Sequence, residues 1–285
     1  MQQRICELFP KESWVYRRES SFVDVNSKEY DAFYHKVGNE YFPSEATVGP
    51  WSSDAQHGGP PAALIAKSFE EFQPRDNARI VRIAIEILRP IPLGRTEVET
   101  VTLRPGRKIE LLGSRMLVDD KLVMSAQAWR MRTSAGLTEE IGSETAPIPL
   151  KLEPGAMTSN EVFFPYADSI DWCYVDGGFD LLGSSTVWSR PKIPLVAGEV
   201  DSPLTRMLLM ADSANGVSSV LPFDQWTFVP VDLCVSIFRY PKGEWLGMSA
   251  ETILGPDGVG TSRTTLFDQQ SSVGSSIHTL FVEPH

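Results

Sequence analysis

The chain has 285 residues and a formal net charge of −11 at pH 7, so it can bury one large core or two of ordinary size. Its negative charge disfavours a nucleic-acid partner, because phosphate backbones repel it. No apolar run reaches the roughly 18 residues that a membrane helix needs, and the first residues hold no signal-peptide core, so we expect a cytoplasmic protein with no membrane role.

A helix over residues 60–69 is the first element that the sequence predicts. Pro60 and Pro61 suit its first turn, and the apolar residues that follow recur at helical spacing. Four strands come next, at residues 80–88, 96–103, 109–118 and 122–131, where β-branched and apolar residues are bounded by Gly and Pro. We interpret these strands as a four-stranded meander that follows a helix.

The same unit recurs at an offset of 150 residues. Residues 87–90 match 237–241, 104–106 lie beside 255–258, 117–120 fall on 267–270, and 123–129 fall on 273–279. Four matches in one ungapped register indicate a duplication. A second predicted helix, at residues 203–214, again has proline near its start and precedes the second set of strands.

Residues 134–160 are rich in Ser, Thr, Glu, Gly and Pro, which is typical of a linker. We therefore expect an N-terminal domain over residues 1–133, this linker, and a C-terminal domain over residues 161–285 whose opening strands lie within 161–200. A helix laid across a curled antiparallel sheet, built twice, predicts an α+β fold. Its two antiparallel sheets, each wrapped around a central helix, would pair edge to edge and so cover exposed strands.

His57-Gly58-Gly59 stands at the start of the first predicted helix. Amides in a first helical turn lack intrahelical partners and lie at the positive end of the helix dipole, so they can hold a carbonyl oxygen as it gains charge. Glycine lets a ligand approach this backbone closely, which favours Gly58 and Gly59 as substrate contacts and Gly59 as the amide donor. His57 is a candidate to hydrogen-bond the carbonyl, although a histidine before a Gly-Gly turn is also a common structural residue.

Asp212 lies in the middle of the second predicted helix, after the apolar residues 207–211. A carboxylate among apolar residues tends to have a raised pKa, which suits a general base or nucleophile; the alternative is a solvent-facing residue of an amphipathic helix. The first helix offers His-Gly-Gly but no acid, and the second offers an acid but no Gly-Gly. This complementarity predicts one composite site where the two copies meet.

Three further residues of the second half are weaker candidates. His278 is a lone histidine on the last predicted strand, and Asp232 and Thr252 lie near strand ends, where each also has an ordinary structural interpretation. The three cysteines are scattered without a CxxC pair, and the chain has no GxSxG, Walker A, GxGxxG or HExxH motif. We therefore expect no disulfide framework, no metal and no organic cofactor.

The His-Gly-Gly helix start resembles the phenylacetyl-CoA thioesterase type of hotdog enzyme. The second half is similar to the acyl-CoA thioesterase II, or double-hotdog, family in the order of its motifs: Ala211-Asp212 at a helix end, a strand leading to Arg239 and Pro241, then residues 255–258 and a closing strand at 275–278. The resemblance covers about residues 22–282. It implies two fused hotdog domains and a small-molecule acyl thioester substrate, carried by CoA or a carrier protein, and it leaves a homo-oligomer open.

In that family an Asp on the second helix, a Thr just before a strand and a Gln on the final strand together bind the attacking water. The Asp falls on Asp212 and the Gln on His278. The Thr falls on Pro230, which cannot donate a hydrogen bond, and Thr227 lies nearby as a replacement.

As a hypothesis, we expect the thioester carbonyl to accept a hydrogen bond from the Gly59 amide while Asp212 activates water or attacks directly. His278 then positions the water or protonates the leaving group. Two alternatives stay open: dehydration, cyclisation or product release in a biosynthetic pathway, and non-catalytic binding of an acyl ligand. The side chains that could meet CoA phosphates, or simply face solvent, are Arg79, Arg104, Arg107 and Lys108.

Overall fold

The computed structural model of the chain describes residues 30–146 and 164–285. The elements of the first half are β1 (Tyr34–Val37), β2 (Glu40–Pro43), the 3-10 turn η3 (Glu45–Thr47), α1 (Gly59–Glu71), β3 (Ala78–Ile87), β4 (Thr96–Arg104), β5 (Ile109–Val118) and β6 (Lys121–Arg132). Those of the second half are α2 (Pro165–Asp168), β7 (Ile170–Gly178), β8 (Leu181–Pro191), α3 (Pro203–Ala211), α4 (Ala214–Val217), β9 (Trp226–Pro230), β10 (Asp232–Ile237), β11 (Leu246–Leu254), β12 (Val259–Phe267) and β13 (Ser272–Pro284). The predicted first helix and the four strands after it are confirmed as α1 and β3 to β6. Within the described residues, no helix is long and apolar enough to cross a membrane.

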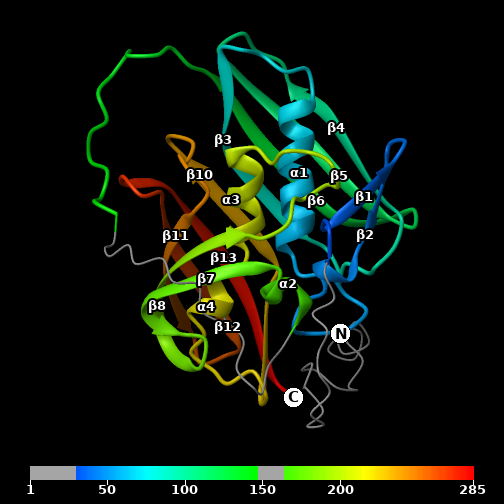
Figure 1. Cartoon of the computed structure of the whole chain (residues 1–285), viewed down its shortest axis with the longest axis vertical. Helices are drawn as coiled ribbons and strands as arrows, with labels where there is room; N and C mark the ends of the chain where they lie inside the picture. The colour runs from blue at the N-terminus through cyan, green and yellow to red at the C-terminus, as the bar shows by residue number, and fades with distance from the viewer. Residues whose placement is uncertain (1–29, 147–163) are drawn as a thin grey trace.

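The strands of the described residues join a 13-stranded sheet whose order is the same in both halves when read outward from its centre. The order is β1-β2-β4-β5-β6-β3, then β10-β13-β12-β11-β8-β7, with β9 paired to β13 off this path. At the centre β3 and β10 pair antiparallel, and Ala84 faces Cys234. These residues are 150 positions apart, which is the offset of the sequence repeat. The two copies therefore meet through equivalent strands, and each covers a sheet edge of the other (Figure 1).

The interpretation of the first four strands as a simple meander is wrong. β3 pairs with β6 and β10, whereas β4 pairs with β5 and β2. The connection at residues 88–95 therefore carries the chain past β6 and β5 before β4 begins. Apolar alternation identifies a strand but not its neighbour, because the neighbour depends on how the sheet folds around α1. This connection also forms part of the wall of a cavity.

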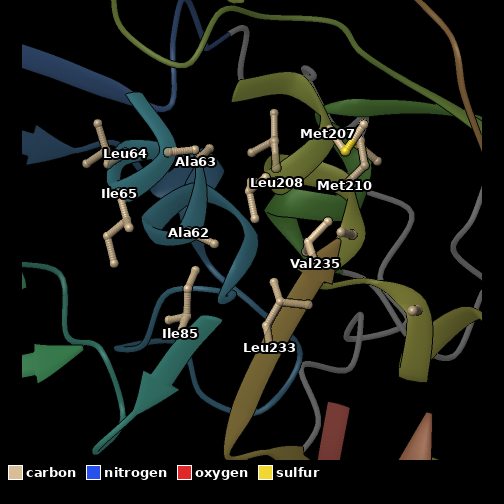
Figure 2. Close-up of a cluster of buried hydrophobic side chains, with 14 of the residues drawn as sticks. Ala62, Ala63, Leu64, Ile65, Ile85, Met207, Leu208, Met210, Leu233 and Val235 are labelled. Atoms are coloured by element: carbon tan, nitrogen blue, oxygen red, sulfur yellow. The ribbon is translucent and has the colours of Figure 1, made fainter. Parts of the chain in front are cut away.

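Helices α1 and α3 lie side by side at the centre of the hydrophobic core (Figures 1 and 2). Leu64 of α1, Leu208 of α3 and Ile85 of β3 are all fully buried, and burial of such a side chain contributes about 1.5–3 kcal/mol. The helices approach each other closely at the first turn of α1. There a Cβ added to Gly59 would lie 2.3 Å from the carbonyl oxygen of Leu209, so glycine is required for this contact.

Asp212 lies at the end of α3 and not in the middle of a longer helix, as the sequence analysis expected. The helix stops at Ala211, because the amides of Asp212 and Ser213 both donate to the carbonyl of Met210 and tighten the last turn. The short helix α4 begins two residues after Asp212, at Ala214. The interruption leaves the carboxylate of Asp212 next to Gly58 at the start of α1.

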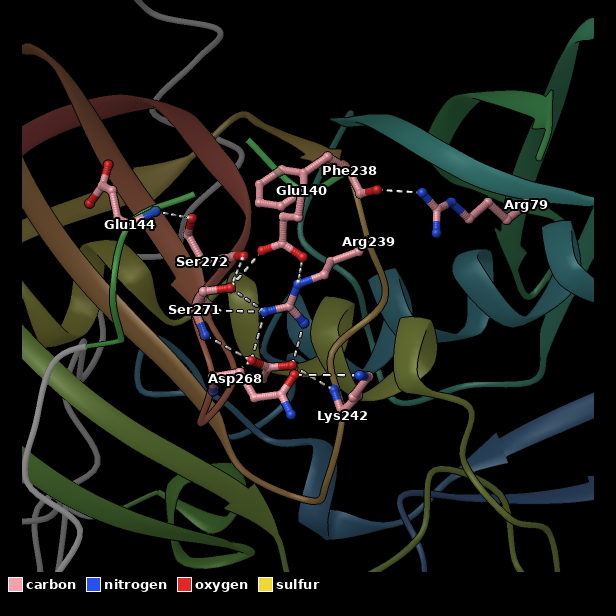
Figure 3. A network of polar contacts seen from close by, with 10 residues as sticks. Arg79, Glu140, Glu144, Phe238, Arg239, Lys242, Asp268, Ser271 and Ser272 are labelled. Atoms are coloured by element: carbon pink, nitrogen blue, oxygen red, sulfur yellow. Dashed lines mark hydrogen bonds and ion pairs between the residues drawn. The ribbon is translucent and has the colours of Figure 1, made fainter. Parts of the chain in front are cut away.

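A network of ion pairs ties the segment after β6 to the second half (Figure 3). Arg239 bonds both carboxylate oxygens of Asp268, and its Nε lies 3.2 Å from Glu140. Burial raises the pKa of Asp268, but Arg239 and three backbone amides outweigh burial and hold this pKa well below its usual range. Part of the predicted linker, residues 134–146, thus contacts the second half. Its remainder, residues 147–160, lies outside the described residues.

Candidate active site

A cavity of about 640 Å³ is lined by residues of both halves. Its wall comes from the loop before α1, the connection after β3, the junction of α3 and α4, and the end of β9. The larger apolar side chains in the wall are those of Trp51, Ile87, Ile91, Phe164, Phe223 and Phe281. Among the described residues that line the cavity, the ionisable ones are Asp54, His57, Arg89 and Asp212. An apolar cavity with a few polar groups is typical of a small-molecule site.

The loop before α1 is held in place by hydrogen bonds on both sides. The amide of His57 donates to the carbonyl of Thr47 at 2.7 Å, and the amide of Gln56 donates to Ile91 at 2.8 Å. The side chain of Gln56 is bonded at both ends as well. These contacts fix the backbone that presents His57 to the cavity.

The ring of His57 is stacked on Tyr166. The two ring centroids are 3.8 Å apart and the planes are inclined by only 7°. The hydroxyl of Tyr166 donates to the carbonyl of Leu209 at 2.7 Å, so the supporting ring is itself anchored to α3. The side chain of His57 retains 12% exposure.

The amide of Gly59 donates to Nδ1 of His57 at 3.0 Å. The same Nδ1 also lies 3.2 Å from Oδ2 of Asp212. The neutral tautomer that accepts the Gly59 amide at Nδ1 is the one with its proton on Nε2. Burial lowers the pKa of His57, with Asp212 opposing the shift and His278 adding to it. This bond occupies the amide that the sequence analysis expected to bind a substrate carbonyl, and Gly59 does not line the cavity.

Asp212 lies between two imidazoles. Its Oδ2 is 3.2 Å from Nδ1 of His57, and its Oδ1 is 3.6 Å from Nε2 of His278. Burial alone raises the pKa of Asp212, but the two imidazoles and the amide of Gly58 outweigh burial and hold this pKa below its usual value. The expected raised pKa is therefore wrong, because the sequence around Asp212 does not reveal the histidines. The carboxylate is ionised at neutral pH.

Gly58 allows this arrangement because it has no side chain. A Cβ added there would lie 2.7 Å from Oδ2 of Asp212 and 2.9 Å from both Cγ and Oδ1. Real Cβ atoms essentially never make contacts this short. The carboxylate of Asp212 thus occupies the space beside Gly58 that the sequence analysis expected a ligand to use. Gly58 also lines the cavity.

His278 is fully buried on β13 and does not line the cavity. Neither of its ring nitrogens forms a hydrogen bond with another described residue, and the same holds for Oδ1 of Asp212. Ser262, directly opposite on β12, also has an unbonded hydroxyl among the described residues. His278 can therefore act on Asp212 electrostatically, but it has no access to a molecule in the cavity.

Asp232 and Thr252 are not brought to the cavity. The carboxylate of Asp232 accepts the amide of Thr279 at 2.5 Å, which fixes the pairing of two strands. The hydroxyl of Thr252 lies 2.8 Å from that of Ser218 inside the second half. Both side chains thus have structural partners away from the cavity.

Several residues at the site were not singled out from the sequence. Ser213 and Asn215 line the cavity, and the hydroxyl of Ser213 is 2.9 Å from that of Tyr166. Ser213 could have been found, since it directly follows Asp212, but no motif marks Tyr166. Pro230 lines the cavity, whereas Thr227 does not. No group of three or more His, Cys, Asp or Glu in the described part of the chain is arranged to hold a metal ion.

Comparisons with known proteins found two matching family models. The family model of the acyl-CoA thioesterase N-terminal domain matches residues 47–131, and that of the acyl-CoA thioesterase C-terminal domain matches residues 146–282. No curated protein matches the sequence significantly.

Solved structures with the same fold include a conserved protein of unknown function with a hotdog fold from Alicyclobacillus acidocaldarius, at 13% identity and a TM-score of 0.70, covering 89% of this chain and 97% of that one. The acyl-CoA thioesterase II TesB2 of Mycobacterium marinum is 15% identical with a TM-score of 0.62, covering 87% and 92%. The tesB protein of Mycobacterium avium subs paratuberculosis is 16% identical with a TM-score of 0.62, covering 88% and 96%. The chain therefore has a hotdog fold built on a mostly antiparallel sheet.

Proposed function

The chain belongs to the acyl-CoA thioesterase family and is a thioester hydrolase, and from that premise we propose that it hydrolyses acyl-CoA or carrier-protein acyl thioesters with water activated by Asp212. One observation carries the proposal: an ionised and almost fully buried carboxylate stands in the wall of an apolar cavity. The apolar wall suits an acyl chain, and a carboxylate that is ionised at neutral pH is in the form that a general base requires. Its lowered pKa makes Asp212 a weaker base than a carboxylate with a raised pKa would be.

We infer further that the two halves are two fused hotdog domains, over residues 1–133 and 161–285, joined by residues 134–160. The mirrored strand order and the pairing of β3 with β10 support this division. The separate N-terminal and C-terminal family matches support it as well, although the second match begins at residue 146.

In the proposed reaction, Asp212 takes a proton from water as the water oxygen bonds to the thioester carbon. The carbonyl electron pair moves onto the carbonyl oxygen, which the Nε2–H of His57 stabilises. The oxyanion electron pair then re-forms the carbonyl bond as the carbon–sulfur bond breaks. The electron pair of the broken bond leaves on sulfur, and the proton held by Asp212 passes to the thiolate. The products are a carboxylic acid and a free thiol.

His57 takes over the donor role that the sequence analysis gave to the amide of Gly59. A neutral imidazole with its proton on Nε2 can donate to an oxyanion without bringing a second charge that would neutralise Asp212. In this proposal His278 is a positioning residue. Its buried imidazole lowers the pKa of Asp212 and so keeps the carboxylate in its ionised form at neutral pH.

The test replaces Asp212 by asparagine, which preserves shape and removes the base. Thiol release from a panel of acyl-CoA substrates should fall by at least about 100-fold in kcat, while thermal unfolding shows an intact fold. Asp54→Asn makes the same chemical change in the same cavity wall and should leave kcat within about twofold. Wild-type turnover in folded Asp212→Asn protein would remove Asp212 from the mechanism. Absence of hydrolysis across the panel by folded wild-type protein would instead favour a non-hydrolytic role.

A further inference from the structure

We propose that Arg89 binds the phosphate at the end of the pantetheine arm, the group that CoA shares with the prosthetic group of carrier proteins. The inference rests on the proposed function, because it concerns the same cavity. It goes further by assigning a specific side chain to the thiol half of the substrate.

Arg89 is the one lysine or arginine among the described residues that line the cavity. It lies two residues after the end of β3, in the connection that crosses to β4, and its side chain is exposed. It forms no ion pair or hydrogen bond with another described residue. The four basic residues suggested by sequence for CoA phosphates do not line the cavity. Two of them instead bind backbone carbonyls, Arg79 that of Phe238 and Arg104 that of Ile109.

The sequence repeat explains why Arg89 is unpaired. Its counterpart at the offset of 150 is Arg239, which is neutralised by Asp268 and Glu140 (Figure 3). The position in the first half that corresponds to Asp268 is Val118, a buried apolar residue. The arginine at this repeat position is therefore a structural ion-pair partner in the second half, as Arg239, and a cation without a described partner in the first half, as Arg89.

The carboxylates nearest in sequence to Val118 do not replace the missing partner. Asp119 accepts the backbone amide of Arg95, and Asp120 pairs with the guanidinium of Arg95 at 2.9 Å. Glu40 and Glu97 pair with that same guanidinium. These nearby carboxylates thus interact with Arg95, and the positive charge of Arg89 remains available to a ligand.

Electrostatics favour a phosphate as that ligand. The chain carries a net charge of −11, which repels an anionic substrate, so a local cation is needed where its phosphate sits. A guanidinium matches phosphate in a two-pronged hydrogen bond. Because the acyl chain occupies the apolar interior and the thioester lies at Asp212, the thiol arm must run toward the solvent-exposed part of the wall. Arg89 is exposed there, which favours the arm's phosphate over a carboxylate on the acyl chain.

The experiment compares three thioesters with the same acyl group: acyl-pantetheine, acyl-4′-phosphopantetheine and acyl-CoA. Arg89→Gln should lower kcat/KM by about tenfold for the two phosphorylated substrates, chiefly through KM, and leave acyl-pantetheine unchanged. Arg115 is also exposed and without a described partner, but it lies outside the cavity. Arg115→Gln removes the same charge and should change none of the three values.

An equal loss for all three thioesters, or no loss for any, would overturn the assignment. So would a loss seen with acyl-CoA but not with acyl-4′-phosphopantetheine, because the contact would then be with the nucleotide. If wild-type protein hydrolyses none of them, the proposed function fails separately, and calorimetric binding of CoA still tests Arg89. Weaker binding by about tenfold in Arg89→Gln would support the contact, and an unchanged Kd would refute it.

Discussion

Replacement of Gly58 by alanine should lower the catalytic activity strongly and the stability of the fold only slightly. The added methyl carbon would lie 2.7 Å from Oδ2 of Asp212, which is 0.7 Å closer than the 3.4 Å at which ordinary contacts begin. The nearest atoms belong to a side chain, so the carboxylate can rotate away from the methyl group and from the two imidazoles. Mild overpacking of this kind costs about 1 kcal/mol. A displacement of a catalytic group by about 1 Å can lower kcat by about 100-fold.

Gly59→Ala is the matched comparison, because the same methyl group is added one residue later. There the added carbon would lie 2.3 Å from a backbone oxygen, that of Leu209, which cannot rotate away. Helices α1 and α3 would have to separate by about 1 Å, at a cost of about 3 kcal/mol. With a fall of about 2–4 °C per kcal/mol for a chain of this size, Tm should drop by about 6–12 °C.

Thiol-release kinetics and thermal unfolding of both variants measure the two effects. We expect Gly58→Ala to lose about 100-fold in kcat with a Tm within about 4 °C of wild type. Gly59→Ala should show the larger loss of Tm. Full activity in Gly58→Ala, or a lower Tm for Gly58→Ala than for Gly59→Ala, would refute the argument that the two glycines serve different contacts.

The remaining predictions concern pH. The pKa of His57 is lowered from 6.5, so kcat/KM should be maintained at pH 6.5 and fall only in more acidic solution, where the ring is protonated. A midpoint of this fall above pH 6.5 would contradict the neutral state of His57. Asp268 has a lowered pKa in the folded chain, so its stabilisation is present above its unfolded pKa of about 4 and is lost as pH falls through the lowered value. In urea unfolding, Asp268→Asn should be less stable than wild type by about 3 kcal/mol at neutral pH. That difference should shrink below pH 4, and a difference independent of pH would exclude the ion pair as its source.

The sequence alone determined the elements and their duplication. Helical and strand periodicities are local properties, so α1 and the strands β3 to β6 could be located from residue order. The offset of 150 residues identified equivalent strands, and Ala84 and Cys234 of those strands meet at the centre of the sheet. The sequence also predicted that the His-Gly-Gly helix start meets an acid on the other helix, because the first helix has no acid and the second has no Gly-Gly.

Only the tertiary structure decided the strand neighbours and the charge states. The sign of the pKa shift of Asp212 depends on His57 and His278, which lie far from it along the chain. The amide of Gly59 is taken by a ring that approaches it in space, and Tyr166 supports that ring from a distant segment. Electrostatic and stacking energies depend on separations of a few ångströms, and such separations between distant residues exist only once the chain has folded.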